Sequence, residues 1–295
     1  TNHPMVDIYL TDLSATLADA VPLTTVTSGS FTTRFSVDSG PEQQIRITVA
    51  GSDTLLFDSG SLEILEKTED LYALVDDFGP DGANHADVIR TIGADGSTIQ
   101  DESQPASVRI GNYSKQTPVT VVLGTNVYPN INKQTRSISQ EVGTGSLEFT
   151  ITDSANTILE ESESPLAIKS GTFQSFYTFE NNTTDATSIT RSLIVADSFR
   201  LVGDRALVTF INGSNEPVDL YILRPGQDLD EVAPILDNTD FAGQPDNESI
   251  ANNVEYVVRN SNNTETLARI SNAQQEGVSY TLVFDTENVL HLLTD

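Results

Sequence analysis

One stretch of the sequence, Leu207 to Ile222, constrains the fold more than any other. It reads Leu-Val-Thr-Phe-Ile-Asn-Gly-Ser-Asn-Glu-Pro-Val-Asp-Leu-Tyr-Ile, with apolar runs on both sides of a polar centre. The runs alternate with the two-residue period of strands, and Gly, Ser, Asn and Pro are residues that reverse a chain. The stretch therefore predicts two neighbouring strands joined by a turn.

The same pattern recurs twice in the chain. Val108 to Leu123 carries a degenerate copy and Thr1 to Leu10 a truncated one, and the aligned valines are Val6, Val119 and Val218. A period of about one hundred residues corresponds to whole domains in tandem. A matching strand also closes each copy: Val88-Ile-Arg-Thr-Ile, Thr190-Arg-Ser-Leu-Ile and Val289-Leu-His-Leu-Leu.

The rest of the chain is rich in short alternating segments and in Ser, Thr, Asn and Gly, with almost no helical periodicity. These features predict an all-β protein of three tandem Ig-like antiparallel β-sandwich domains, at residues 1–100, 101–203 and 204–295. Short helical turns are expected as insertions within residues 13–21 and 228–236.

Several local expectations follow from spacing and composition. Phe31 to Val37 and Gln44 to Val49 both alternate and are separated by Asp-Ser-Gly-Pro, which is typical of a hairpin. Residues 76–82 have the composition of a turn, and residues 93–105 that of a linker. The aromatic residues between Phe173 and Phe179 fall at period two, which favours a core strand over a platform for stacking sugars.

The repeated pattern also resembles a known family. An alternating strand, an Asn-Gly-Ser or Asn-Tyr-Ser turn with a downstream Pro, and then Val-Asp-Leu-Tyr-Ile is similar to the bacterial surface-protein family called domain of unknown function 4397. The resemblance covers nearly the whole chain in three copies, although only the first and third carry the Asp-Tyr strand. It implies secreted or surface-attached tandem sandwiches with no assigned catalytic residues.

Charge and composition exclude some partners. The chain has 43 acidic and 15 basic residues, and its net charge of -28 repels nucleic acid and anionic membrane surfaces. Such a surface stays soluble at high ionic strength, so an extracellular or cell-surface location fits the composition. The absence of Cys excludes disulfides and thiolate chemistry.

The first copy lacks a strand that the others have. An apolar strand precedes the turn in the second and third copies, whereas only Thr-Asn-His-Pro-Met stands before Val6. A sandwich short of one strand exposes unpaired backbone groups, which another chain can cover by adding a strand. We expect Val6, Ile8 and Leu10 to lie beside the gap and to form an interface. The alternatives are that upstream residues fill the gap, or that the copies are misaligned at this end.

Two kinds of chemical site are suggested by the polar residues. Asp76, Asp77 and Asp81 share a predicted glycine-containing turn, and clustered carboxylates of this kind suit Ca²⁺. No other cofactor is expected. The glycan-acceptor pattern Asn-x-Ser/Thr occurs at Asn112, Asn181, Asn182, Asn212, Asn247 and Asn262.

Catalytic motifs are scarce in the sequence. The three His residues are scattered, and no nucleophile elbow, zinc-binding helix or phosphate loop is present. The sequence therefore predicts a non-enzymatic extracellular structural protein that associates with copies of itself or other surface proteins through strand addition into a filament or layer. The alternatives are a surface adhesin or carbohydrate-binding module that takes glycans and, with least support, a secreted hydrolase that uses carboxylates.

Overall fold

A computed structural model describes residues 3–79, 84–92, 95–182, 189–197, 205–250 and 253–295. The protein is all-β, with 57% of its residues in strands and 2% in helices, as the sequence predicts. It forms two compact units, one of Thr1–Ala106 with Ile168–Thr172 and the other of Ser107–Ala167 with Phe173–Asp295. None of the described helices is long and apolar enough to cross a membrane.

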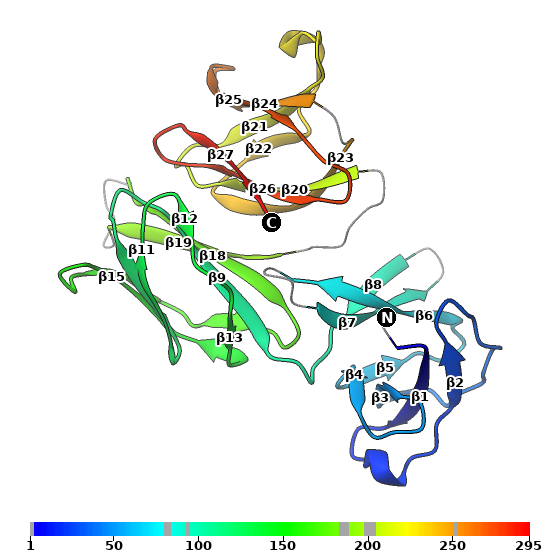
Figure 1. The fold of residues 1–295 in the computed structure, drawn as a ribbon. Helices are drawn as coiled ribbons and strands as arrows, with labels where there is room; N and C mark the ends of the chain where they lie inside the picture. Colours follow the sequence, from blue (N-terminus) through cyan, green and yellow to red (C-terminus); the bar gives the residue numbers. More distant parts are fainter. Residues whose placement is uncertain (1–2, 80–83, 93–94, 183–188, 198–204, 251–252) are drawn as a thin grey trace. The chain divides into compact units, whose positions relative to one another are not determined.

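The first segment, residues 3–99, contains two sheets (Figure 1). One sheet has the order β2-β1-β3-β4, with β5 also paired to β3, and the other has the order β6-β7-β8. Val6, Ile47 and Phe57 from the larger sheet share a core with Val88 of β7. The strands are β1 (Met5–Asp12), β2 (Thr24–Thr27), β3 (Gly40–Val49), β4 (Leu55–Asp58), β5 (Leu62–Ile64), β6 (Asp70–Phe78), β7 (Asn84–Ile92) and β8 (Asp95–Ile99).

The second segment, residues 106–197, also contains two larger sheets. Their orders are β12-β9-β18-β19, with β13 also paired to β9, and β11-β10-β15-β16. Phe149 of β15 and Phe176 of β18 meet edge to face at 4.9 Å, so the two sheets share a core. The strands are β9 (Ala106–Tyr113), β10 (Val119–Leu123), β11 (Asn126–Ile131), β12 (Thr135–Arg136), β13 (Gln140–Val142), β14 (Gly145–Leu147), β15 (Phe149–Asp153), β16 (Ile158–Glu161), β17 (Leu166–Ile168), β18 (Phe173–Glu180) and β19 (Thr190–Ala196).

The third segment, residues 205–295, repeats this arrangement. Its sheets have the orders β23-β20-β26-β27 and β22-β21-β24-β25. Phe210 of β20, Leu220 of β21 and Tyr256 of β24 are fully buried in one core that both sheets share. The strands are β20 (Arg205–Asn212), β21 (Val218–Leu223), β22 (Leu236–Thr239), β23 (Ala242–Ile250), β24 (Asn253–Asn260), β25 (Thr266–Ala273), β26 (Ser279–Phe284) and β27 (Leu290–Thr294).

Strand pairing shows that the three segments follow one plan. In the second segment β9 runs parallel to β18, and in the third β20 runs parallel to β26, whereas the hairpins β18-β19 and β26-β27 are antiparallel. In the first segment β6 and β7 form the equivalent hairpin, and β1, β2, β3 and β4 match β21, β22, β24 and β25. The three closing strands that the sequence aligned are β7, β19 and β27.

Two polar residues of the repeated sequence pattern fix the ends of the sheets. The fully buried Asn212 donates from Nδ2 to the carbonyls of Glu216 and Thr239, and its Oδ1 accepts from the backbone and hydroxyl of Ser214. Asn112 makes the same set of bonds in the second segment. The Asn-x-Ser pattern therefore closes the turn between strands that lie in different sheets.

The Asp of the Val-Asp-Leu-Tyr pattern has a structural role as well. Asp219 is buried and accepts hydrogen bonds from Ser261 Oγ at 2.5 Å and from the backbone of Asn238 at 2.9 Å. Asp7 accepts from Thr25 Oγ1 at 2.5 Å and from the backbone of Gly51 at 2.7 Å. The hydrogen bond from Thr25, followed by that from Gly51, holds the pKa of Asp7 below its usual value.

Several local expectations can be compared with the structure. The helical insertions are confirmed as the short helices η1 (Leu17–Asp19) and η3 (Leu229–Glu231). The linker prediction is wrong in part, because β8 falls within residues 93–105 and pairs with β7. The predicted hairpin also fails, because β3 pairs with β1, β4 and β5 while residues 31–39 form no strand.

Candidate functional site: the open edge of β6

The feature that distinguishes the first segment is one edge of strand β6. Among the described residues β6 pairs only with β7, on one side. Its two counterparts each pair on both sides. Strand β18 lies between β9 and β19, and strand β26 lies between β20 and β27. The place that β9 and β20 take in their sheets therefore holds no strand among the described residues of the first segment. We call this place the β6 seat.

The two complete segments show what a strand in such a seat contributes. Ala206, Val208 and Phe210 of β20 point into the core of the third segment, where all three are 0–1% exposed. Val108 and Ile110 of β9 are likewise fully buried in the second segment. An occupied seat thus buries a row of apolar side chains at period two and satisfies the backbone groups of the neighbouring strand.

Strand β6 is correspondingly exposed. Every described residue of β26 is buried, and so is every residue of β18 except Glu180, whereas Leu71 of β6 is 57% exposed and Ala73 is also exposed. Tyr72 and Leu74 alternate with these residues and are only partly buried against the core. The strand therefore has apolar side chains on both faces and an unpaired edge, which is the arrangement that favours pairing with another chain.

Residues 31–37 lie along the chain where β12, β13 and β23 occur in the other segments. These strands pair with β9 and β20, which have no counterpart among the residues of the first segment that the structure describes. Phe31 is 91% exposed, Phe35 42% and Val37 41%. Arg34 Nη1 lies 3.1 Å from Glu69 Oε1, next to the start of β6. Residues 31–37 therefore form an apolar alternating segment that is not in a strand, and an exposed ion pair links this segment to the residue before β6.

The polar groups of β6 hold the strand in place. Asp70 accepts two hydrogen bonds from Arg90 of β7, at 2.5 and 2.9 Å, and one from the hydroxyl of Tyr72 at 3.1 Å. Burial tends to raise the pKa of Asp70, but the bonds from Arg90 and its other donors hold it below the usual value. Burial raises the pKa of Tyr72 to about 12. Asp70 therefore stays ionised and Tyr72 stays neutral at neutral pH.

The predicted interface residues Val6, Ile8 and Leu10 lie elsewhere than expected. Strand β1 pairs with β2 on one side and β3 on the other, so it has no free edge. Val6 belongs to the core, and Ile8 and Leu10 pack against it together with Leu74. The prediction placed the gap beside the wrong strand, because the strand that precedes β1 in the plan belongs to the opposite sheet, next to β6.

The predicted calcium site is not built as a turn. Asp76 and Asp77 belong to strand β6, paired with Ala86 and His85, and Asp81 lies outside the described residues. In the part of the chain that the structure describes, no group of three or more His, Asp or Glu residues could hold a metal ion. Calcium binding stays a prediction.

The predicted glycan acceptors differ in their surroundings. Asn112 and Asn212 are fully buried, with their amides engaged in the turns described above. Asn182 and Asn262 are exposed, and Asn181 is half-buried. Asn247 lies in β23, where its side chain is outside the described part of the structure. In the folded state, burial therefore rules out Asn112 and Asn212 as glycan acceptors, whereas Asn182 and Asn262 are open to solvent.

A buried cluster that sequence reasoning missed joins the second and third segments. Arg109 Nη2 lies 2.7 Å from Asp295 Oδ1, Arg109 Nε lies 3.4 Å from Asp197 Oδ2, and Arg136 also pairs with Asp295. Burial raises the pKa of Asp197 to about 6 although Arg109 opposes the shift. The aromatic residues Tyr113, Tyr177 and Phe179 pack in one apolar cluster with Ile211 and Val283 from the third segment.

This cluster also accounts for the aromatic strand of the second segment. Phe176 faces its own core, whereas Tyr177 and Phe179 face the third segment, so both faces of β18 are buried. His291 Nε2 lies 2.8 Å from Asp285 Oδ2, and its ring centroid lies 5.2 Å from that of Tyr113. The aromatic residues and this histidine therefore form a joint between segments, and burial of the aromatic strand is confirmed.

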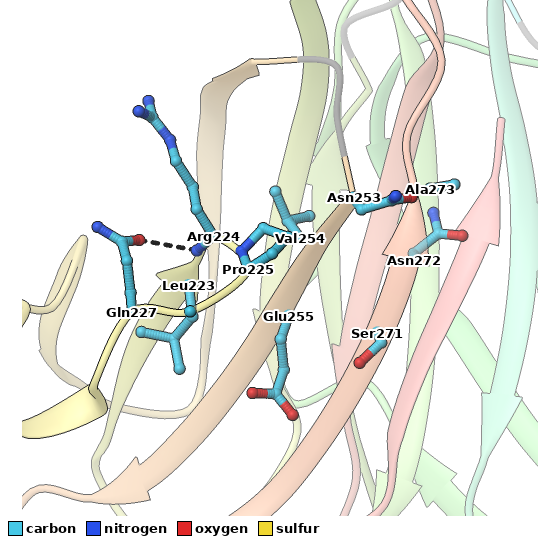
Figure 2. Close-up of a pocket in the computed structure, with 11 residues that line it drawn as sticks. Leu223, Arg224, Pro225, Gln227, Asn253, Val254, Glu255, Ser271, Asn272 and Ala273 are labelled. Carbon is cyan, nitrogen blue, oxygen red and sulfur yellow. Dashed lines mark hydrogen bonds between the residues drawn. The ribbon is translucent and has the colours of Figure 1, made fainter.

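A shallow pocket lies at one end of the third segment (Figure 2). It has a volume of about 440 Å³ between the loop after β21 and the strands β24 and β25. Gln227 accepts a hydrogen bond from the backbone of Arg224 at 2.7 Å, and Glu255 and Ser271 line the opposite wall. None of the described lining residues is aromatic, so the pocket has no ring on which a sugar could stack.

These observations define an all-β protein of repeated sheet pairs in which, among the described residues, one sheet has no counterpart of β9 and β20. No protein-family model matches the chain, and no curated protein matches its sequence. The resemblance to domain of unknown function 4397 stays a prediction.

Proposed function

We propose that the chain is a non-enzymatic extracellular structural protein of three tandem Ig-like sandwiches that associates with copies of itself. The first sandwich is completed by a strand from a neighbouring molecule, which links subunits into a surface filament or layer. A strand passed from each subunit to the next makes a heterologous contact, and such contacts give open filaments when they do not close. The resemblance to a surface-protein family and the acidic composition support the extracellular location.

The observation that carries this proposal is the unpaired edge of β6 beside exposed apolar residues. Backbone groups on such an edge, and apolar side chains such as Leu71 and Phe35, gain from covering by another strand. The two equivalent edges in the same chain are both covered. Strand addition is therefore a contact that this fold already makes twice within the chain.

The test is the size of the native protein in solution, combined with negative-stain imaging. We expect a mass that grows with concentration and fibres or sheets in the images. The double variant Leu71→Asp/Phe35→Asp should remain monomeric, because charges on an exposed edge oppose pairing. The matched control Val21→Asp changes a residue that is 84% exposed in the same segment, and it should assemble like the unmodified chain.

A uniform monomer at all concentrations would contradict self-association. Equal assembly of the unmodified chain and the double variant would contradict the β6 edge as the contact.

A further inference from the structure

We infer that the β6 seat selects a strand of defined chemistry: an extended segment with apolar residues at alternate positions and a terminal Asn, running parallel to β6. The inference rests on the proposed strand addition and specifies the strand that is added. The occupant is an otherwise unpaired segment of a neighbouring polypeptide. Its chemistry is inferred from the two strands with which the same chain fills the equivalent places, β9 beside β18 and β20 beside β26.

The direction of the occupant follows from the pairing in the complete segments. Strand β9 runs parallel to β18 from Ser107 opposite Phe173 to Tyr113 opposite Phe179. Strand β20 runs parallel to β26 from Leu207 opposite Ser279 to Asn212 opposite Phe284. Because β6, β18 and β26 are equivalent strands, a strand added to β6 should begin beside Asp70 and run toward Phe78.

The side chains of the occupant follow from the core that it must cover. Ala206, Val208 and Phe210 alternate along β20 and face the core of the third segment. In the first segment the corresponding core includes Tyr72 and Leu74, which are only partly buried. A row of apolar side chains at period two would complete their burial, whereas a charged residue in the row would be placed in an apolar environment without a partner.

The far side of the seat sets a second requirement. Strands β12 and β23 pair antiparallel with β9 and β20. Residues 31–37 occupy the corresponding part of the first segment and form no strand. A strand in the seat would therefore pair with β6 on one side and draw residues 31–37 into an antiparallel pair on the other, covering Phe35 and Val37.

The end of the occupant is specified by the two internal examples. Strand β20 ends at Asn212 and β9 carries Asn112 near its end, and both amides donate to two carbonyls that border the neighbouring sheet. An Asn at the end of the added strand can make equivalent bonds. This residue gives the seat a means to fix the register of the strand as well as its direction.

The test uses the full chain and a synthetic peptide with the sequence of residues 205–212, Arg-Ala-Leu-Val-Thr-Phe-Ile-Asn. The matched control peptide carries Val208→Asp and Phe210→Asp. Amide hydrogen exchange is followed in residues 70–78 and 31–37. We expect the first peptide to slow exchange in both ranges on the order of tenfold or more and to block assembly, and the control peptide to do neither.

A nitroxide label at the peptide N-terminus reports direction. The parallel arrangement predicts loss of amide signals near Asp70, whereas loss near Asp76 would overturn the inferred direction. Equal effects of both peptides would overturn the alternating apolar pattern.

The outcomes separate this inference from the proposed function. If neither peptide binds but the chain assembles and the Leu71→Asp/Phe35→Asp variant does not, strand addition stands and the inferred donor chemistry is overturned. If the first peptide binds in the predicted direction but the chain alone stays monomeric, the donor chemistry is supported and self-association is overturned, because no second copy of this chain then supplies the strand.

Discussion

The first and third segments share much of their topology, but among the described residues the first has no counterpart of the central strand β20 or of its neighbour β23, and the third has none of β8. In the third segment β20 lies between β23 and β26, and Phe210 and Leu282 beside it are fully buried. In the first segment that place has no strand among the described residues, Leu71 is more than half exposed, and residues 31–37 form no strand. The central strand β20 thus pairs with the strands on both of its sides and buries the residues beside it.

The comparison also separates the parts of the plan that depend on that strand from the parts that do not. The sheet that contains β1 is complete, with pairing on both sides of β1 and the same buried Asp as in β21. Only the sheet β6-β7-β8 differs, because no described strand pairs with the second edge of β6. The loss is therefore local to one sheet, and the first segment keeps a core on which an added strand can pack.

We expect the largest difference between the two segments when an aromatic side chain is removed from each. Phe210→Ala should lower the free energy of unfolding of the third segment by about 3–5 kcal/mol, because it removes a fully buried ring and leaves a cavity. Phe35→Ala should change the free energy of unfolding of the monomer by less than about 0.5 kcal/mol, because Phe35 is exposed. Denaturant unfolding of both variants checks this, and similar losses would mean that residues 31–37 are packed.

We expect a smaller and similar loss of stability in both segments when their equivalent buried Asp is replaced. Asp219→Ala should cost about 1–3 kcal/mol, because it leaves the donors of Ser261 and Asn238 without their acceptor. Asp7→Ala should cost a similar amount, since Asp7 accepts from Thr25 and Gly51 in the same way. Thermal unfolding of each variant measures the losses. A neutral Asp7 variant would show that the shared Asp does not stabilise the first segment.

The last expected effect concerns pH and the joint between the second and third segments. Burial raises the pKa of Asp197 to about 6, against an unfolded value of about 3.9, so the folded protein binds this proton more tightly. The stabilisation from the proton is present below pH 4 and is lost as the pH rises to about 6. Asp295 and the cations Arg109 and Arg136 face the same cluster.

Asp197→Asn removes this titration. The free energy of unfolding of the native chain, minus that of the variant, should therefore fall between about pH 4 and pH 6 and stay level above pH 6. Unfolding curves over this range provide the measurement. A difference that rises with pH would show that Arg109 outweighs burial and lowers the pKa of Asp197 instead.

Much of the fold could be predicted from the sequence because strand alternation is a local signal. The period-two runs gave the positions of β1, β7, β19, β20 and β27 directly. Strand β8 was missed because Asp95, Gly96 and Ser97 have the composition of a linker, and only its pairing with β7 makes it a strand. Residues 31–37 show the converse, since an alternating sequence does not form a strand without a neighbour to pair with.

The candidate site could be predicted in kind but not in place. Comparison of the copies indicated a missing strand before Val6, and the structure has an unpaired edge of that type. The expected neighbours Val6, Ile8 and Leu10 were wrong because successive strands of a sandwich often lie in opposite sheets. Asn212 fitted the glycan-acceptor pattern as well as a turn, and only its burial and four hydrogen bonds distinguish the two roles.

Amide hydrogen exchange of β6, compared with β18 and β26 in the same sample, shows whether the edge of β6 is open in the monomer and covered on assembly. In dilute protein we expect the amides of β6 to exchange much faster than those of β18 and β26, and in concentrated, assembled protein we expect all three strands to be protected. Equal protection of β6, β18 and β26 in the dilute monomer would contradict the account, because the edge of β6 would then already be covered within a single chain.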